Sequence, residues 1–459
     1  MVQEVSHNPL RELPSVDLLL GRPAFSTTLL LYGRDLVRVQ IRSELDRLRA
    51  EIRSSKTAID SLELEHRVDG LADRVRIGLE EAFGAPIRRV LNATGVFLHT
   101  NLGRAPLPPA VASVLPGLLD ASCDLEFDLE SGERGDRNDS VAALLAALTG
   151  AEAAVVVNNN AAALVLILAS CARGREVVVS RGELVEIGGS FRIPDILEAA
   201  GVGLVEVGTT NRTRLSDYEQ AIGRDTGLLL KVHTSNYRQV GFVESVSSAD
   251  LAELGKRLGL AVVVDEGAGL LRPHPAPQLA DHTSLSEVIA AGCDLACGSG
   301  DKVLGGPQAG LIVGSADLVE RCRRYALYRA VRPDRTTLVT LESVLRLHLA
   351  GTALPLDRLW PDAAEHRHRL EWVGSKLGAE IVEAEAFVGG GAAPAQAIPG
   401  QALALPESPA LLEGMRRTEP PVVGYIRHGR LVLDLRTVDP ADDETLVGSV
   451  LEAQAALEP

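Results

Sequence analysis

The feature that most restricts the fold of this 459-residue chain is an alternation of short β-branched runs with helical stretches across its middle. The runs lie at residues 154–157, 176–180, 204–207, 228–233, 261–265, 294–297 and 311–313. Such alternation predicts a mainly parallel sheet covered by helices on both faces. Ligands of these folds bind at the carboxyl ends of the strands, so the polar residues that follow the runs are the candidates for function.

Two further regions flank this predicted large domain, which we assign to residues 76–345. Residues 1–75 predict a helical N-terminal domain, because apolar residues recur there at the period of a helix. These residues are Val37, Ile41, Leu45, Leu48 and Ile52. Residues 346–459 predict a small C-terminal α+β domain, with a hairpin in residues 422–436 that turns at His428 and Gly429.

The charge of the chain limits the kinds of partner that it can bind. The formal net charge of -16 argues against a protein that coats nucleic acid with a uniformly basic surface. The first 90 residues, however, carry 14 basic and 14 acidic side chains, so the whole negative excess lies beyond them. If a polyanion binds, the N-terminal domain is where we expect it.

The cysteines and the apolar runs indicate the compartment. Five scattered cysteines, none spaced as zinc or redox ligands are, are typical of buried thiols in a reducing cytosol. The N-terminus shows no signal-peptide pattern, and the longest apolar run, residues 161–172, is too short to span a bilayer. We therefore expect a cytoplasmic protein without a membrane segment or a metal site.

The stretch GSGDKVLGGPQAG at residues 298–310 carries one lysine among small residues. Lys302 has little room there to reach solvent, and desolvation disfavours its ammonium form. A neutral amine suits a lysine that forms an imine with pyridoxal phosphate, and the hydroxyl of Ser299 suits the cofactor phosphate. The alternative is a structural glycine-rich turn with an exposed lysine.

Two other strand ends complete a candidate cofactor site. Asn159 and Asn160 start an apolar helix, where free N–H groups and the helix dipole favour a phosphate, although an ordinary asparagine cap is the alternative. Asp265 ends its run before two glycines, so its carboxylate can pair with a protonated pyridine nitrogen, or else cap the next helix. Phosphate turn, aspartate and lysine succeed one another in this order in the aspartate-aminotransferase-like fold.

The stretch KVHTSNYR at residues 231–238 comes directly after a further predicted strand. His233 and Asn236 are candidates to contact the cofactor, with the imidazole over its ring or the amide at its O3' oxygen. A histidine satisfied within the core is an equal alternative for His233.

An excess of arginine is a further feature of the candidate site. Arg104, Arg137, Arg329 and Arg332 suit a phosphate-like or carboxylate anion, which a guanidinium group binds through two parallel N–H bonds. Surface salt bridges are the alternative, and they are favoured for Arg134.

A second set of arginines lies in the N-terminal domain. Arg34, Arg38 and Arg42 fall along one flank of the apolar stripe, as a helix bound to a phosphate backbone would require. Acidic residues are interleaved with them, so the residues alone favour a solvated, salt-bridged face.

Several long motifs resemble those of the bacterial selenocysteine synthases, the L-seryl-tRNA(Sec) selenium transferases. They are LNATGVFLHTNLGRAPL at 91–107, SRGELVEIGGSFRIPD at 180–195, SGDKVLGGPQAG at 299–310 and LVLDLRTV at 431–438, with RELPSVD at 11–17. The likeness runs nearly from end to end. One departure is Glu266, where the family more often has a smaller or apolar residue, which affects the local packing rather than the role of Asp265.

The resemblance implies an α/β pyridoxal-phosphate enzyme of fold type I. It would convert seryl-tRNA(Sec) to selenocysteinyl-tRNA(Sec) through an aminoacrylyl intermediate, with selenophosphate as the selenium donor for selenoprotein synthesis. Lys302 would be the Schiff-base lysine, Asp265 the pyridine partner, and Asp301 an aid to proton transfers. Selenophosphate would be held by Arg104, Arg137, Arg329 and Arg332.

The resemblance also implies partners for the rest of the chain. The N-terminal domain would bind tRNA, which reverses the interpretation of Arg34, Arg38 and Arg42 given by the residues alone. The protein would be a homo-oligomeric ring of dimers, a decamer.

Two other functions stay open. One is a pyridoxal-phosphate-dependent lyase that acts on a free small amino acid or an amino sugar phosphate, although such an enzyme has little use for a separate helical domain. The other is a tRNA-binding protein without catalysis, against which the retained Lys302 and Asp265 argue.

Overall fold

The computed structural model describes residues 9–54, 61–84, 87–187, 191–235, 237, 239–280 and 282–457. The chain divides into two compact units, Met1–Arg89 and Val90–Pro459. Within the described ranges, no helix combines the length and the apolar character that crossing a membrane requires.

The first unit is helical. Its elements are η1 (Pro9–Arg11), α1 (Val16–Leu20), η2 (Pro23–Phe25), α2 (Ser26–Ser54), α3 (Ser61–Asp69) and α4 (Leu71–Phe83). The apolar stripe of α2 is buried in one cluster with Leu71, Val75 and Leu79 of α4. Gly33 interrupts α2 with φ 75 and ψ 159, a conformation that glycine adopts without strain. The expected domain boundary at residue 75 falls inside α4.

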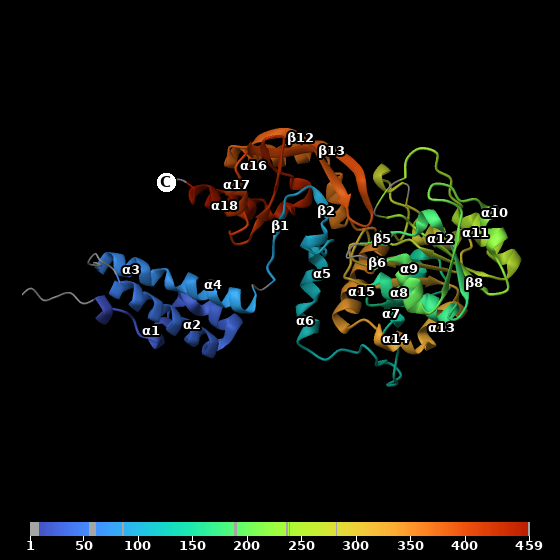
Figure 1. The fold of residues 1–459 in the computed structure, drawn as a ribbon, viewed down its shortest axis with the longest axis horizontal. Helices are drawn as coiled ribbons and strands as arrows, with labels where there is room; N and C mark the ends of the chain where they lie inside the picture. The colour runs from blue at the N-terminus through green and yellow to red at the C-terminus, as the bar shows by residue number, and fades with distance from the viewer. Residues whose placement is uncertain are drawn as a thin grey trace, which may run out of the picture. The chain divides into compact units, whose positions relative to one another are not determined.

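The second unit (Figure 1) contains the predicted mainly parallel sheet. Its described strands run in the order β3-β11-β10-β9-β8-β4-β7. Their bounds are β3 (Ala153–Val157), β4 (Glu176–Ser180), β7 (Gly203–Val207), β8 (Thr226–Val232), β9 (Ala261–Asp265), β10 (Leu295–Ser299) and β11 (Gly310–Gly314). Only β11 runs antiparallel to its neighbours within this sheet as described. Each run predicted from the sequence forms one of these strands, because such runs bury apolar side chains on both faces.

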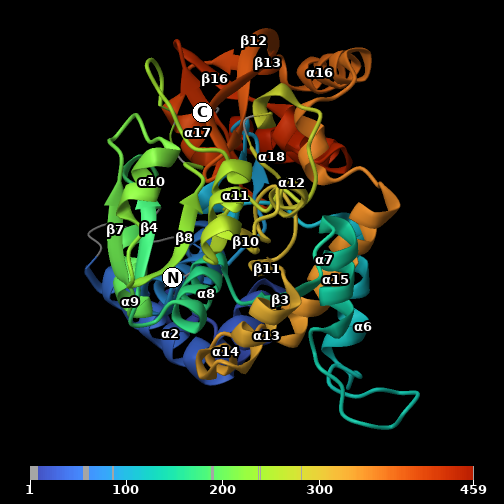
Figure 2. The same ribbon diagram turned by 90° about the vertical axis from the view of Figure 1, so that its right-hand side faces the viewer.

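Helices cover both faces of this sheet. One face packs on α7 (Asp139–Thr149), α10 (Leu215–Ala221), α11 (Ser248–Leu258), α12 (Leu285–Ala290) and α15 (Arg335–Ala350). The other packs on α8 (Asn160–Cys171), α9 (Ile193–Ala200), α13 (Ala316–Arg324) and α14 (Ala326–Ala330). Figure 2 shows α7 and α15 side by side on their flank of the unit.

The C-terminal part of the second unit forms a smaller sheet in the order β15-β16-β13-β12-β2. Its strands are β2 (Val96–Leu98), β12 (Glu380–Gly389), β13 (Ala393–Pro406), β15 (Tyr425–Arg427) and β16 (Arg430–Leu433). The predicted hairpin is confirmed, since β15 and β16 are antiparallel and join through His428 and Gly429, both with positive φ. β2 lies in the region that the sequence assigned to the large domain, yet it pairs with β12.

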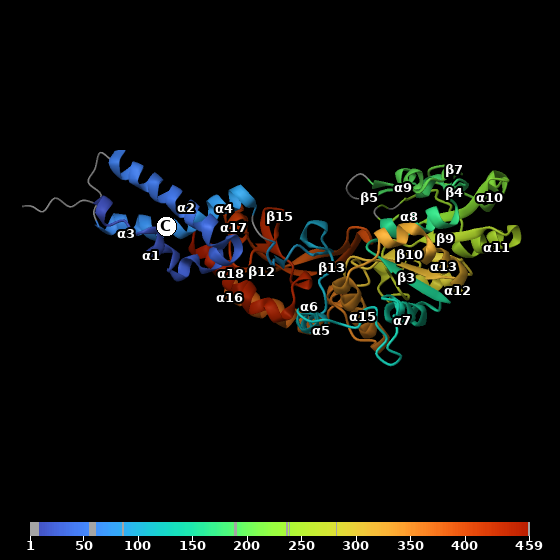
Figure 3. The ribbon, with the colours of Figure 1, turned by 90° about the horizontal axis from the view of Figure 1, so that it is seen from below.

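Three helices pack on the smaller sheet through one apolar cluster (Figure 3). They are α16 (Ala363–Leu377), α17 (Pro409–Met415) and α18 (Asp443–Ala455). The short elements of this unit are β1 (Leu91–Asn92), which pairs with β14 (Val422–Val423), β5 (Glu186–Ile187), which pairs with β6 (Phe191–Arg192), α5 (Pro109–Val114), α6 (Pro116–Leu119), η3 (Thr100–Leu102), η4 (Arg181–Glu183), η5 (Pro277–Leu279), η6 (Pro355–Leu359), η7 (Leu435–Thr437) and η8 (Pro440–Asp442).

A further apolar cluster joins the two sheets. Phe97 of β2 and Ala386 of β12 belong to it, together with Ala268 after β9 and Val303 after β10. The cluster therefore holds the loops at the carboxyl ends of β9 and β10 against the smaller sheet.

Candidate active site

Lys302 and Asp265 lie at the ends of two adjacent parallel strands. Asp265 is the last residue of β9, and Cys297 of β10 is its partner in the strand register. Lys302 comes after β10, and its Nζ donates to the carbonyl oxygen of Gly267 over 2.8 Å. The exposed fractions are 6% for Lys302 and 3% for Asp265. The predicted pair is therefore brought together in a buried position.

Burial shifts both groups toward their neutral forms. Desolvation lowers the pKa of the Lys302 amine and raises the pKa of the Asp265 carboxyl. Asp265 Oδ1 accepts from Asn160 Nδ2 over 2.8 Å and from Cys297 Sγ over 3.7 Å. Among the described residues, its hydrogen bonds come from uncharged donors.

These residues fit a pyridoxal phosphate molecule. A buried carboxyl whose hydrogen-bond donors are uncharged suits a protonated pyridine nitrogen, and a desolvated amine suits the cofactor's carbonyl group. The Oδ1 atom of Asn160 is buried and has no hydrogen-bond partner within the described chain. A Cβ atom at Gly391 would lie 2.8 Å from the Nζ of Lys302, so this glycine leaves the space around the amine open.

The predicted phosphate turn lies at the start of α8. Asn159 caps this helix, with its Oδ1 accepting from the backbone N–H of Ala162 over 2.9 Å. The asparagine cap that the sequence analysis gave as an alternative is therefore present. The other backbone N–H groups of the first helical turn can still donate hydrogen bonds to a phosphate. Ser299 is buried at the end of β10.

Asp301, next to the lysine, is bound by the first predicted arginine. Arg104 Nη1 donates to Asp301 Oδ2 over 2.6 Å, and the backbone N–H of Ala105 donates to the Asp301 carbonyl oxygen. Arg104 has a φ of 63, which is uncommon for a residue with a side chain. The HTNLGR loop is therefore folded against the residue that precedes Lys302.

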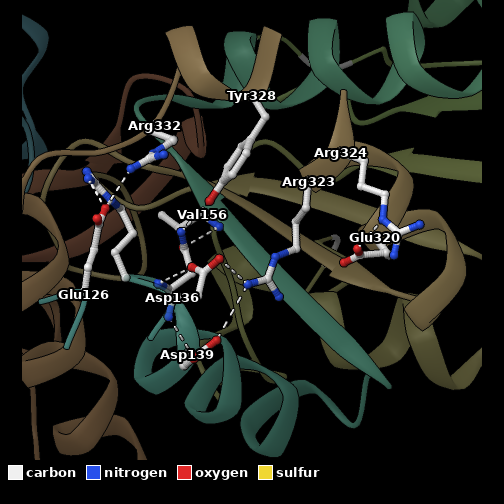
Figure 4. A network of polar contacts seen from close by, with 11 residues as sticks. Glu126, Asp136, Asp139, Val156, Glu320, Arg323, Arg324, Tyr328 and Arg332 are labelled. Atoms are coloured by element: carbon white, nitrogen blue, oxygen red, sulfur yellow. Dashed lines mark hydrogen bonds and ion pairs between the residues drawn. The ribbon is translucent and has the colours of Figure 1, made fainter. Parts of the chain in front are cut away.

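Two other predicted arginines meet at a glutamate that the sequence did not single out. Glu126 Oε1 accepts from Arg332 Nη2 over 2.7 Å and from Arg137 Nε over 2.8 Å, with a second, shorter bond from Arg137 Nη2. Glu126 Oε2 accepts from Arg134 over 2.9 Å. Figure 4 shows Arg332 pointing at Glu126. The hydrogen bonds from Arg137 are the largest cause of the lowered pKa of Glu126.

This arginine cluster is tied to the phosphate turn. The backbone N–H of Asn158 donates to the carbonyl oxygen of Val331 over 2.9 Å, and Val331 directly precedes Arg332. The side chain of Asn138 joins Val156 of β3 to the hydroxyl of Tyr328 (Figure 4).

The remaining predicted arginines are dispersed. Arg329 is exposed in the last turn of α14 and takes part in none of the ion pairs of the described residues. In the first unit, Arg34 pairs with Asp17 at 3.6 Å and Arg38 with Asp35 at 2.9 Å. Arg42 is exposed and has no ion pair within the described chain.

His233 contacts another histidine. Its Nε2 lies 2.8 Å from Nδ1 of His282, and burial next to His282 lowers the pKa of His233 to about 3. Both line a cavity of about 720 Å³ that Val264 and Glu266 also line. Because side chains alternate along a strand, Val264 of β9 projects to the face opposite Asp265. Asn236 lies outside the described residues.

Glu266 is buried, and the sequence analysis noted it only as a departure from the family pattern. Its Oε2 accepts from the N–H groups of Gly269 and Leu270, over 2.5 Å and 3.3 Å, and its Oε1 has no partner in the described structure. Burial raises its pKa to about 8. Glu126, His282 and Cys297 gave no sequence signal, because only the fold brings them to their partners.

Two family models and several relatives match this chain. The family model described as L-seryl-tRNA selenium transferase matches residues 90–439, and the model described as selenocysteine synthase N terminal matches residues 10–49. The L-seryl-tRNA(Sec) selenium transferase of Carboxydothermus hydrogenoformans is 43% identical over 444 residues, which cover 94% of each chain. That of Moorella thermoacetica is 42% identical over 468 residues, covering 98% of this chain and 97% of its own.

Among solved structures, the D-glucosaminate-6-phosphate ammonia-lyase is similar with a TM-score of 0.59 and 20% identity, over 83% of this chain and 99% of its own. At this identity the likeness concerns the fold alone. The family models and the relatives together cover both compact units. The chain therefore belongs to the L-seryl-tRNA selenium transferase family.

Proposed function

We propose that this protein is a pyridoxal-phosphate-dependent L-seryl-tRNA(Sec) selenium transferase, which converts seryl-tRNA(Sec) to selenocysteinyl-tRNA(Sec). The observation that carries the proposal is the buried amine of Lys302 beside the buried carboxyl of Asp265, at adjacent strand ends. Full-length relatives with this activity in their names support it.

The bound cofactor supplies an electron-withdrawing ring that stabilises negative charge at the α carbon of the seryl group. Asp265 would pair with the protonated ring nitrogen of the cofactor, and Asn160 Nδ2 donates to this carboxyl and fixes its orientation. Desolvation lowers the pKa of Lys302 and so favours its neutral amine, and its Nζ is the group that would take the α proton. Asp301, oriented by Arg104, assists the later proton transfers.

With the cofactor bound, the seryl hydroxyl would leave with a proton as water, and the β carbon must then react with the selenium donor before it reacts with water. We propose that selenophosphate is held by Arg137 and Arg332, with Arg104 and Arg329 as further contacts. The excess of guanidinium groups over carboxylates around Glu126 supports an anion there, and the bond from Asn158 to Val331 keeps the cluster near the cofactor phosphate turn.

The proposed tRNA contact is the helical first unit, through Arg34, Arg38 and Arg42 of α2. Arg34 and Arg38 form ion pairs with Asp17 and Asp35. Because ion pairs that solvent reaches are weak, these arginines can exchange their carboxylates for phosphates. Arg42 is exposed. RNA helices are recognised mainly by backbone and shape, which suits a set of charges on one helix flank.

The oligomer and the compartment are also proposals. A ring of dimers, a decamer, is expected from the family, and exposed apolar side chains near the cavity, such as Val240 and Phe242, are consistent with contacts between copies. Light scattering of the purified protein tests this. We propose that the reaction runs in the cytoplasm, where charged tRNA is used.

The activity is tested by the Lys302→Ala variant, assayed for conversion of seryl-tRNA(Sec) with selenophosphate. Loss of the proton-accepting amine should lower the rate at least about 10³-fold. Lys256→Ala, which alters an exposed lysine of α11, is the matched control. A Lys302→Ala enzyme with the wild-type rate would contradict the proposal.

A further inference from the structure

The segment between α6 and α7 brings a carboxylate into the arginine cluster proposed above for selenophosphate. This segment, residues 120–138, is described throughout and contains no helix or strand, and Figure 2 shows it extending as a long loop. Glu126 lies within it and receives Arg134, Arg137 and Arg332 on its two oxygens. A carboxylate and a phosphoryl group both present oxygens that guanidinium groups bind in the same way.

The charges around Glu126 do not balance. Three guanidinium groups share this one carboxylate, and the nearby Asp136 is engaged by Arg323 at 2.7 Å. Arg137 and Arg332 have exposed side-chain fractions of 21% and 20%, so the excess charge is only partly solvated. A dianion would neutralise the cluster better than one carboxylate does.

The cluster stays assembled by contacts that do not involve Glu126. Arg137 Nη1 donates to the carbonyl oxygen of Pro333 over 3.0 Å, and Val331 is held by Asn158. When Glu126 leaves, Arg137 therefore keeps a side-chain hydrogen bond, and the backbone that carries Arg332 stays anchored through Val331. Glu126 itself has 27% of its side chain exposed, on a loop whose internal links include the bridge between Phe127 and Arg134.

We propose that Glu126 is an internal occupant of the selenophosphate site, which the anionic substrate displaces from Arg137 and Arg332. This inference rests on the proposed function. Glu126 keeps the arginines paired while the site holds no donor, and it raises the concentration of anion needed to fill the site. A singly charged carboxylate ligand would compete poorly with Glu126. A phosphoryl dianion would compete better, because its second negative charge neutralises the positive charge of the arginines that Glu126 leaves uncompensated.

The test is the affinity of the cofactor-loaded protein for inorganic phosphate, an inert probe, measured by calorimetry at low salt. Glu126→Gln should bind phosphate about tenfold more tightly than the wild type, because a charged competitor becomes a neutral one. The KM for selenophosphate should fall in parallel, with an unchanged cofactor spectrum. Glu133→Gln, which removes an exposed carboxylate from the same loop, is the matched control and should bind as the wild type does.

A double variant separates this inference from the proposed function. In an Arg332→Ala background, the gain from Glu126→Gln should become smaller, because Glu126 then competes with the anion for Arg137 alone. Weaker or unchanged phosphate binding by Glu126→Gln would overturn the inference and leave the anion site intact, since Glu126 would then only position the arginines. Unchanged phosphate binding by Arg332→Ala and by Arg137→Ala would instead contradict the selenophosphate site itself.

Discussion

The Nζ atom of Lys302 lies 2.8 Å from the carbonyl oxygen of Gly267, two positions beyond Asp265 in the chain. The parallel pairing of β9 with β10 produces this proximity, because it sets the loops after both strands at one edge of the sheet. A buried amine and a buried carboxyl, each shifted toward its neutral form, are thereby ready for a cofactor that carries both a carbonyl group and a basic ring nitrogen.

Asp265→Asn should weaken cofactor binding without destabilising the cofactor-free protein. Burial raises the pKa of this carboxyl, so replacing it with an amide should change the stability of the cofactor-free protein little. The variant nevertheless loses the charged contact to the ring nitrogen of the cofactor. We expect cofactor affinity to fall about 10- to 100-fold. Titration with pyridoxal phosphate and thermal melts with and without it measure both effects. Equal affinities of the variant and the wild type would contradict the role of Asp265.

Glu266→Gln should stabilise the protein, and increasingly so as the pH rises. The pKa of Glu266 is raised from 4.5 to about 8 by burial, so the folded chain keeps a proton that the unfolded chain loses. The stability of the wild type therefore falls between these two pH values, whereas the glutamine variant has no such loss. The difference in free energy of unfolding should grow by about 1.4 kcal/mol per pH unit across this window.

Denaturant unfolding of Glu266→Gln and wild type at several pH values between about 5 and about 8 measures this slope. Glutamine retains the oxygen that accepts from Gly269, so packing changes little. A stability difference that is the same at every pH would show that Glu266 is ionised in the folded protein.

Gly391→Ala should displace Lys302. The new methyl group would lie 2.8 Å from both the Cε and the Nζ of Lys302, at a residue with φ +80. Gly351→Ala is a matched control, because Gly351 has φ +66 and its Cβ would meet no atom within 4 Å. Both variants should lose about 1 kcal/mol from backbone strain, but only Gly391→Ala should lose the cofactor absorbance. An unchanged absorbance in Gly391→Ala would place the lysine elsewhere.

Arg38→Ala combined with Arg42→Ala should weaken tRNA binding and leave the cofactor spectrum unchanged. Loss of two phosphate contacts should make the dependence of log affinity on log salt shallower by about 1.5. Arg47→Ala, on another side of α2 and paired with Glu51 at 3.6 Å, is the control. If tRNA affinity and its salt dependence stay at the wild-type values, these arginines are not in the interface.

Much of the fold can be predicted from local patterns in the sequence. The strands of the large sheet were predicted, because branched apolar runs bounded by turns are a local signal. The turn at His428 and Gly429 is another local signal. The pairing of β2 with β12 was not predicted, since no local pattern records which distant strand completes an edge. The domain boundary was predicted at residue 75, inside α4, because no local pattern shows that α4 packs against α2 in the first unit.

The candidate site shows the same limit at the level of side chains. Lys302, Asp265 and Asn160 were predicted because together they follow the predicted strands in the order of phosphate turn, aspartate and lysine, although each has an alternative role when taken alone. Glu126 was not, because its contact with Arg332 joins positions 206 residues apart. His233 was open between a cofactor contact and the core, and the structure gives it His282 as a neighbour, which the sequence could not indicate.

The most direct test of the proposed activity mixes the cofactor-loaded protein with seryl-tRNA(Sec) or with free serine, and then adds selenophosphate. Visible absorbance monitors the cofactor, and analysis of the amino acid on the tRNA monitors the product. We predict an absorbance change with seryl-tRNA(Sec) alone, and selenocysteinyl-tRNA(Sec) once selenophosphate is present. An absorbance change with free serine and no selenium on the tRNA would contradict the account and indicate a lyase of small amino compounds.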